Sequence, residues 1–253
     1  MGQTGARRTE AMLTENLQAF VLSTLDYGDS DRIVSLFSLE HGRIKGFARG
    51  ARNSRKRFGA ALESFARIEA QIRVKDGLSG LKQAEIINIY PEIRRDLARI
   101  AHALYACELV DTLTPEGHPL PRLYRLLTAY LDRLESEVAT EGDRRFFEIN
   151  LLNILGYRPA LETCSRCDTP FGGEDAFLGL GCEIACRRCG SNGRQLTSAT
   201  LRTLLSCLST ARFGLIAFST ETLSQSGGLL DEALAAHAGK RLRSLEFLRQ
   251  SGP

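Results

Sequence analysis

The chain has 253 residues, of which 43% are hydrophobic, so it holds enough apolar material for two or three small domains. Its apolar runs fall well short of the roughly 20 residues that a membrane-spanning helix needs, and residues 1–14 lack the apolar core of a signal peptide, which excludes a membrane protein and predicts a cytoplasmic location. The net charge of +3 does not by itself indicate a nucleic-acid-binding protein, and the seven cysteines fit a reducing compartment better than a disulfide framework.

Short runs that alternate apolar and polar residues follow a polar N-terminal tail. Residues 1–14 have no periodicity and are predicted to be disordered. Residues 15–90 then carry five runs with the period of two that is typical of half-buried strands, separated by turn residues. These runs are 17–25, 32–39, 43–48, 65–74 and 81–89. Five short strands with little room for helices predict a small, partly open barrel of the OB type, with an SH3-like barrel or an open meander as alternatives.

The strongest charge feature of the chain lies within this predicted barrel. Between Gly42 and Arg57 there are seven basic residues and no acidic one. The basic residues are Arg43, Lys45, Arg49, Arg52, Arg55, Lys56 and Arg57. Seven like charges repel one another, and a polyanion would relieve that repulsion, so the segment is a candidate DNA-binding site. The alternative is a solvated loop that binds nothing.

The predicted strand 43–48 combines this charge with an aromatic ring. Alternation places Arg43, Lys45 and Phe47 on one face, while Ile44 points into the core. Proteins that bind single strands use this combination, because cations follow the phosphates and an aromatic ring offers a surface on which a base stacks. A core position for Phe47 is the alternative. Residues 49–57 are predicted to form a mobile loop that is too charged to bury.

From Pro91 onward the apolar period changes from that of a strand to that of a helix. Three amphipathic helices are predicted in residues 91–160, and they form a bundle. We expect His102 on a helix surface and His118 in a loop. Further helices are predicted in residues 193–253, where they pack on the bundle. The predicted helices are 93–113, 121–138, 143–155, 198–210, a helix from 222 or 229 to 237, and 242–249.

Four cysteines after the third predicted helix have the spacing of a metal site. Cys164 with Cys167, and Cys186 with Cys189, form two C-x2-C pairs separated by 18 residues, which is typical of a four-thiolate zinc site. The sequence therefore predicts a zinc-finger insertion over residues 161–192 that holds one structural Zn²⁺. Cys182 offers a fifth thiol, but its use with Cys189 would put six residues between ligands and leave Cys186 idle. Ordinary reduced cysteines in a loop are the alternative.

Motifs of the common enzyme classes are absent from the sequence. There is no phosphate loop, no glycine-rich dinucleotide motif, no nucleophile elbow and no H-E-x-x-H. Asp26, Asp29 and Asp31 are expected in a turn, where aspartate bonds to the backbone. A metal-dependent nuclease is the disfavoured alternative, because no carboxylate cluster suited to two metal ions is evident. The chain is therefore predicted not to be an enzyme.

The order of barrel, basic segment, helical bundle and paired cysteines resembles the bacterial recombination mediator family RecO. Matching segments are YGDSDRIV at 27–34, GRIKGFARGAR at 42–52, RFGAALE at 57–63 and GKRLRSLEFL at 239–248. The resemblance covers nearly the whole chain. It implies an α+β protein with an N-terminal OB-fold barrel, followed by an α-helical domain that carries a zinc-finger insertion with four cysteine ligands.

The resemblance also implies a role in DNA repair. A member of this family binds single- and double-stranded DNA, anneals complementary strands and cooperates with RecR, and in some pathways RecF, to load RecA onto DNA coated by single-strand-binding protein. It also binds the acidic C-terminal tail of that coating protein, for which an apolar groove beside arginines in the helical part would be suitable. Such a protein is cytoplasmic and nucleoid-associated. A zinc-stabilised scaffold that binds only protein is the alternative.

Overall fold

The computed structural model describes residues 14–75 and 77–251, with the side chains of Arg249 and Ser251 left aside. The chain forms two compact units. The barrel unit runs to Ile89 and includes Glu116–Pro119, and the helical unit contains Tyr90–Pro115 and the chain from Leu120 onward. The predicted disorder of residues 1–13 lies outside the described residues.

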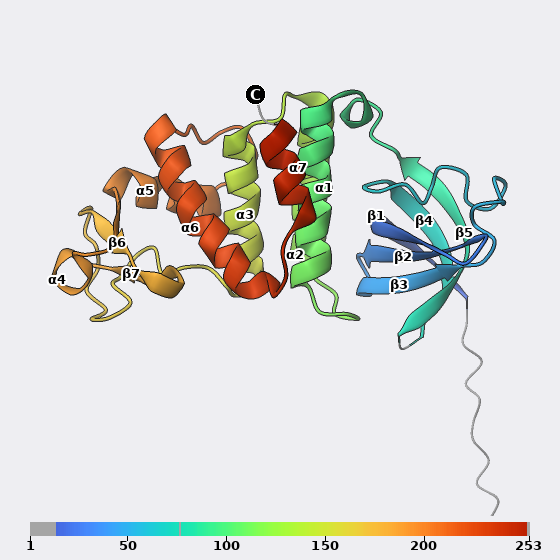
Figure 1. The fold of residues 1–253 in the computed structure, drawn as a ribbon, viewed down its shortest axis with the longest axis horizontal. Helices are drawn as coiled ribbons and strands as arrows, with labels where there is room; N and C mark the ends of the chain where they lie inside the picture. Colours follow the sequence, from blue (N-terminus) through green and yellow to red (C-terminus); the bar gives the residue numbers. More distant parts are fainter. Residues whose placement is uncertain (1–13, 76, 252–253) are drawn as a thin grey trace, which may run out of the picture. The chain divides into compact units, whose positions relative to one another are not determined.

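The barrel unit is a closed five-stranded barrel (Figure 1). Its strands follow the order β1-β2-β3-β5-β4, and β4 pairs with β1 to close the ring. The β3–β5 pair is parallel and the other pairs are antiparallel. The strands are β1 (Glu15–Tyr27), β2 (Asp31–Ser38), β3 (Gly42–Ala48), β4 (Arg67–Arg73) and β5 (Leu78–Asn88). The prediction of an OB-type barrel is therefore confirmed, although the ring is closed where a partly open one was predicted.

Apolar side chains from alternate strand positions fill the barrel, as the period of two predicts. Ile44, Ile68 and Ile72 belong to one buried cluster. The segment between β3 and β4 contributes to the same cluster, because Ala51, Phe58, Ala61 and Leu62 are buried in it. The prediction that residues 49–57 are too charged to bury was therefore wrong for Ala51, whose side chain enters the core while the cations of the segment are exposed.

A short segment from the helical half of the sequence completes the barrel unit. The amide of Gly117 donates to the carbonyl oxygen of Arg43 at 2.8 Å. Gly42 has a φ of +64°, and a Cβ at this position would lie 1.8 Å from the His118 carbonyl oxygen. Only glycine allows the two backbones to come this close. The sequence pattern predicted a loop at residues 116–119, and the structure has a loop there. The pattern did not predict that this loop is attached to β3.

The helical unit contains the six predicted helices, together with short elements. Within it, α1 packs against α2 and α7, and α3 packs against α2, α5 and α6. The helices are η1 (Ile93–Arg95), α1 (Leu97–Leu113), α2 (Pro121–Ser136), α3 (Glu141–Leu155), α5 (Ser198–Ser209), α6 (Thr220–Ala238) and α7 (Arg243–Ser251). Helix α3 begins two residues before its predicted start, because the Thr140 side chain accepts from the Asp143 amide and caps it. No helix in the described ranges has the length and apolar character of a membrane span.

His102 is buried, so the prediction of a helix-surface position was wrong. Its side chain is 7% exposed, and its Nδ1 lies 2.8 Å from the Tyr130 hydroxyl. The cause is that α1 is covered on more than one side, by α2 and by α7. Farther along the same helix, the Tyr105 hydroxyl donates to Glu148 at 2.8 Å, and Glu148 accepts from Arg145 at 2.7 Å.

The insertion between α3 and α5 contains a small sheet that the sequence pattern did not predict. Its strand order is β7-β6-β8, and both pairs are antiparallel. The elements are β6 (Ala176–Leu178), η2 (Leu180–Cys182), β7 (Ile184–Ala185), α4 (Arg187–Gly190) and β8 (Arg194–Leu196). Strands of two or three residues are too short to show an alternation. The sheet brings the second pair of cysteines back toward the first.

Candidate nucleic-acid interface and cysteine cluster

The face of β3 has the alternation that the sequence predicts. Lys45 is exposed, Arg43 and Phe47 are half-buried, and Ile44 is buried. Arg43 lies 3.9 Å from the Glu116 carboxylate, so an acidic residue balances part of its charge. Lys45 and Phe47 thus remain available at the barrel surface, while Arg43 is partly engaged within the barrel unit.

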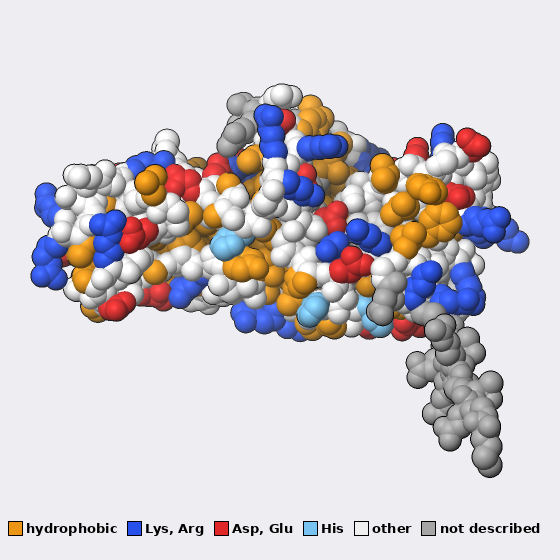
Figure 2. All heavy atoms as spheres, turned by 60° about the horizontal axis from the view of Figure 1, so that its bottom comes forward, with side chains coloured by type: hydrophobic (Ala, Val, Ile, Leu, Met, Phe, Trp, Pro, Cys, Tyr) orange, Lys and Arg blue, Asp and Glu red, His pale blue; other side chains and the backbone are white. Residues whose placement is uncertain are grey.

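An aromatic neighbour of Phe47 was missed in the sequence analysis. The Tyr27 ring is edge-on to the Phe47 ring at a centroid distance of 6.0 Å, and Tyr27 is 55% exposed. The exposed Leu25 extends this face, because Leu25 and Phe47 both pair with Ile33 across β2. Figure 2 shows apolar side chains gathered on the barrel surface with Lys and Arg side chains beside them. The signal available in the sequence was an aromatic residue, Tyr27, immediately before the turn that begins Gly28-Asp29.

The basic segment 49–57 presents its cations to solvent. The side chains of Arg49, Arg52, Arg55, Lys56 and Arg57 are exposed. Arg57 is tied into the segment, because its guanidinium donates to the Arg49 carbonyl oxygen at 2.8 Å and to the Ser54 hydroxyl at 2.9 Å. Across the described residues, no carboxylate forms an ion pair with Arg49, Arg55 or Lys56. These three charges are free to meet phosphates.

The β1–β2 hairpin holds the start of the basic segment. Asp31 accepts from the Gly50 amide at 2.7 Å, and the Ser30 carbonyl oxygen accepts from the Arg52 amide at 3.0 Å. Asp26 pairs with Arg32 at 3.0 Å and with Arg52 at 3.8 Å. Asp26 and Asp31 lie in strands and only Asp29 lies in the turn, so the prediction that all three share a turn was wrong. The longer strands extend the hairpin by pairing Asp26 with Arg32.

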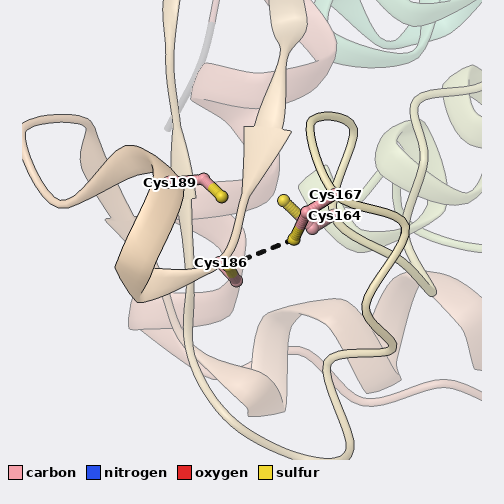
Figure 3. A group of neighbouring side chains, drawn as sticks. All are labelled: Cys164, Cys167, Cys186 and Cys189. Atoms are coloured by element: carbon pink, nitrogen blue, oxygen red, sulfur yellow. Dashed lines mark hydrogen bonds between the residues drawn. The ribbon is translucent and has the colours of Figure 1, made fainter.

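The four predicted cysteines come together in the insertion of the helical unit. One Sγ atom from each of Cys164, Cys167, Cys186 and Cys189 lies within 4.8 Å of the others (Figure 3). The Cys167 and Cys186 sulfurs are 3.8 Å apart. Cys182 is not part of the cluster, and its residue has a φ of +65° in the bend before β7. The structure therefore brings together the two C-x2-C pairs that the spacing predicts.

Hydrogen bonds hold the two cysteine pairs against each other. The Ser165 amide and hydroxyl both donate to the Ile184 carbonyl oxygen at 2.9 Å, which ties the first turn to β7. Arg166 makes a two-pronged ion pair with Glu183, with N–O distances of 2.9 and 2.7 Å. The Cys189 amide donates to the Cys186 carbonyl oxygen at 2.9 Å, which closes the second turn. The cluster is thus assembled by the protein's own contacts.

The thiols of the cluster cannot all ionise by themselves. Hydrogen bonding with Thr169 lowers the pKa of Cys167 to about 6, whereas hydrogen bonding with Cys167 raises the pKa of Cys189 to about 12. The thiolate on one residue is thus stabilised by a proton kept on another. A divalent cation would stabilise all four thiolates at once, and four sulfur donors around one point are the donor set that suits a metal such as Zn²⁺. These residues can hold a metal ion.

The fold and these sites define a class of protein in which an OB-type barrel with a basic and aromatic face is joined to a helical unit with a four-cysteine, metal-type cluster. Two family profiles match the chain: "Recombination protein O N terminal" over residues 12–90 and "Recombination protein O C terminal" over residues 94–246. The chain belongs to the RecO family, which confirms the resemblance found in the sequence.

Relatives from several bacteria match along nearly their entire length, and each bears the name DNA repair protein RecO. The relative from Pelobacter propionicus is 69% identical over 94% of this chain and 98% of its own. The Geobacter sulfurreducens relative is 51% identical over 93% and 98%. The Myxococcus xanthus relative is 35% identical over 92% and 96%.

Proposed function

We propose that this protein binds single- and double-stranded DNA through its barrel unit, anneals complementary strands and, together with RecR, helps to load RecA onto DNA coated by single-strand-binding protein. One observation carries the proposal: exposed cations stand beside an aromatic pair at the β2–β3 face and the β1–β2 loop. In OB-folds these are the surfaces that bind oligonucleotides. The proposed location is the nucleoid, in the cytoplasm. RecF is an additional proposed partner in some pathways.

The charge arrangement fits annealing, because two complementary strands repel each other through their phosphates. Arg49, Arg55 and Lys56 project from one ordered segment, and Lys45 lies on the neighbouring strand. Cations spread in this way neutralise phosphates on more than one strand and release the counterions around them. Tyr27 and Phe47 offer ring faces to unpaired bases.

We propose that the protein acts without catalysing a reaction. Two carboxylates beside the basic segment are engaged with the protein itself, because Asp26 pairs with arginines and Asp31 accepts from a backbone amide. A nuclease that uses two metal ions needs carboxylates free to bind them. The observed engagement supports a binding role.

Titration of a labelled oligothymidylate, followed by fluorescence anisotropy at several salt concentrations without magnesium or nucleotide, tests the DNA-binding proposal. The variant with both Arg52→Glu and Arg55→Glu is expected to bind at least about tenfold more weakly at low salt. The slope of log affinity against log salt should flatten by about 0.7 for each phosphate that the variant no longer neutralises. Arg125→Glu makes the same kind of charge change in the helical unit and serves as the control.

Two outcomes would contradict the proposal. If the unaltered protein shows no salt-sensitive binding, the protein-only scaffold becomes the better interpretation. If labelled DNA is cut when magnesium is added, the protein is a nuclease. Annealing of complementary strands should be measured in the same samples, and the doubly substituted variant should anneal more slowly than the unaltered protein.

A hollow in the helical unit supports the proposed partnership with the acidic tail of single-strand-binding protein. Its volume is about 440 Å³, which suits an aromatic side chain and its neighbours. Arg122 and Arg125 of α2 lie on its rim, and both are exposed. Phe146 and Phe213, whose ring centroids are 4.5 Å apart, also line it. Arginines beside an apolar hollow match an acidic peptide that ends in phenylalanine.

The tail proposal is tested by titrating a labelled acidic peptide with a C-terminal phenylalanine. Arg125→Glu is expected to weaken binding at least about tenfold, because it removes an attractive charge and adds a repulsive one. The DNA variant Arg52→Glu/Arg55→Glu should bind the peptide normally. Equal binding by Arg125→Glu and the unaltered protein would exclude this hollow.

For the cysteine cluster we propose one Zn²⁺ with a structural role. Four thiolate ligands complete a tetrahedral site and leave no position for a reacting water. Cys164 is fully buried in the protein and Cys167 is exposed at the surface, so the bound ion would sit at the edge of the fold.

A further inference from the structure

Three arginines of the barrel unit line one hollow. Arg32 comes from β2, whereas Arg52 and Arg55 come from the basic segment. The hollow has a volume of about 480 Å³, and its remaining wall is formed by Ala51, Gly59, Ala60 and Glu63. Small residues along the wall leave room for a ligand beside the three guanidinium groups. Glu63 is the acidic residue of the lining.

The protein already supplies an anion to two of these arginines. Asp26 lies at the end of β1, with one carboxylate oxygen 3.0 Å from Arg32 Nε and the other 3.8 Å from Arg52 Nε. One carboxylate therefore bridges cations that belong to different segments. Arg52 is also fixed by its backbone, because its amide donates to Ser30, and its guanidinium donates to the Asp29 carbonyl oxygen at 3.3 Å.

The bridge is exposed enough to exchange with an outside anion. The side chains of Asp26, Arg32 and Arg52 are 53%, 25% and 44% exposed. Exposed ion pairs contribute little net stability, so replacing the carboxylate costs little. A phosphodiester has two free oxygens that can bind a guanidinium in a bidentate manner, and Arg55, which has no carboxylate partner among the described residues, adds a third cation.

We infer that Arg32, Arg52 and Arg55 bind one backbone phosphate of single-stranded DNA, and that Asp26 occupies two of these arginines when DNA is absent. The inference rests on the proposed function and adds Arg32 as a contact and Asp26 as an internal competitor. Its position agrees with the fold, since Asp26 and Arg32 flank the β1–β2 loop, one of the two loops that OB-folds use for oligonucleotides. The carboxylate holds the two guanidinium groups together and gives way when the phosphate arrives.

Substitution of the competitor separates this inference from a general effect of charge. Asp26→Asn is expected to tighten binding of labelled oligothymidylate about threefold at low salt, the order expected for one exposed ion pair. Asp29→Asn removes the same charge from the same hairpin, but only the backbone of Asp29 contacts Arg52. It is the matched control, and we expect a smaller gain from it. Thermal unfolding of each variant verifies that the barrel is intact.

A second set of variants tests the arginines. Arg32→Gln should weaken binding about threefold, and the gain from Asp26→Asn should disappear when Arg32 and Arg52 are both replaced by glutamine. If Asp26→Asn and Asp29→Asn increase DNA affinity equally, or if Asp26→Asn does not increase it, the inference that Asp26 competes with the phosphate is wrong. If the unaltered protein shows no salt-sensitive binding to DNA, the proposed function is refuted, and this inference is refuted with it.

Discussion

His102 keeps a neutral imidazole inside the helical unit. Burial, chiefly, lowers its pKa from 6.5 to about 4. The charged groups near it are Glu141, Arg144, Asp143 and Arg145, whose opposing effects are smaller. Because the unfolded chain binds a proton at this residue between pH 6.5 and pH 4 and the folded chain does not, acid favours unfolding in that window.

We therefore expect the stabilising effect of the neutral His102 to be fully present above pH 6.5. Below that pH the free energy of unfolding of the helical unit should fall, by about 3 kcal/mol at pH 4. Urea unfolding at a series of pH values measures it. Tyrosine fluorescence is a suitable signal, since the chain has no tryptophan and five of its six tyrosines lie in the helical unit. His102→Gln should flatten the dependence, whereas His118→Gln, an exposed loop substitution, should not. An unchanged pH profile in His102→Gln would contradict this assignment.

Which single residues could be predicted depended on whether their role is local. The face shared by Lys45 and Phe47 follows from the period of one strand, and the sequence analysis predicted it. The Tyr27–Phe47 contact and the Asp26–Arg32 pair both require the register of β1, β2 and β3, which no local pattern contains. The burial of His102 depends on its contact with Tyr130 of α2, which the pattern of α1 alone does not contain.

At the scale of elements, the insertion around the cysteine cluster is expected to depend on its metal. Its strands have only two or three residues each, too few to be stable alone. Cys186→Ser removes one of the four proposed ligands, so the metal content should fall well below one ion per chain, and residues 163–196 should become sensitive to protease. Metal analysis and limited proteolysis measure these effects.

Cys182→Ser is the matched control, because it makes the same chemical change outside the cluster. It should keep its metal and its resistance to protease. Loss of the metal in Cys182→Ser would show that Cys182 is a ligand. A metal content unaffected by Cys186→Ser would show that the cluster does not need all four thiols.

The elements themselves were predicted well where they are long and periodic. The five strands of the barrel alternate along their own sequence, and among the long helices α2 has a clearly separated apolar face. The sheet β6-β7-β8 was not predicted, because its strands of two or three residues are too short to show an alternation. The prediction for segment 49–57 was wrong for a different reason: the many charges hide one apolar residue, Ala51, whose side chain enters the core.

At the scale of the whole molecule, the proposed DNA and peptide sites lie on different units. This separation predicts that they can be disabled independently. Arg125→Glu should anneal bare complementary strands at the normal rate but should be slowed at least about tenfold on strands coated by single-strand-binding protein. Arg52→Glu/Arg55→Glu should be slow on both substrates. Annealing assays on bare and coated strands provide the measurement, and coated strands whose binding protein lacks its C-terminal tail are the control. Equal annealing of coated strands by Arg125→Glu and the unaltered protein would contradict this division.

The attachment of Glu116–Pro119 to β3 bears on how the protein matures on the ribosome. All five barrel strands have been synthesised by residue 88, and N-terminal domains generally fold first during synthesis. Yet the carbonyl oxygen of Arg43 receives its partner, the Gly117 amide, only after all of α1 has also emerged. The ribosome therefore translates one entire helix between the last barrel strand and the segment that attaches to β3. During that interval β3, the strand with the densest basic charge beside it, lacks the hydrogen bond from the Gly117 amide that it has in the finished protein.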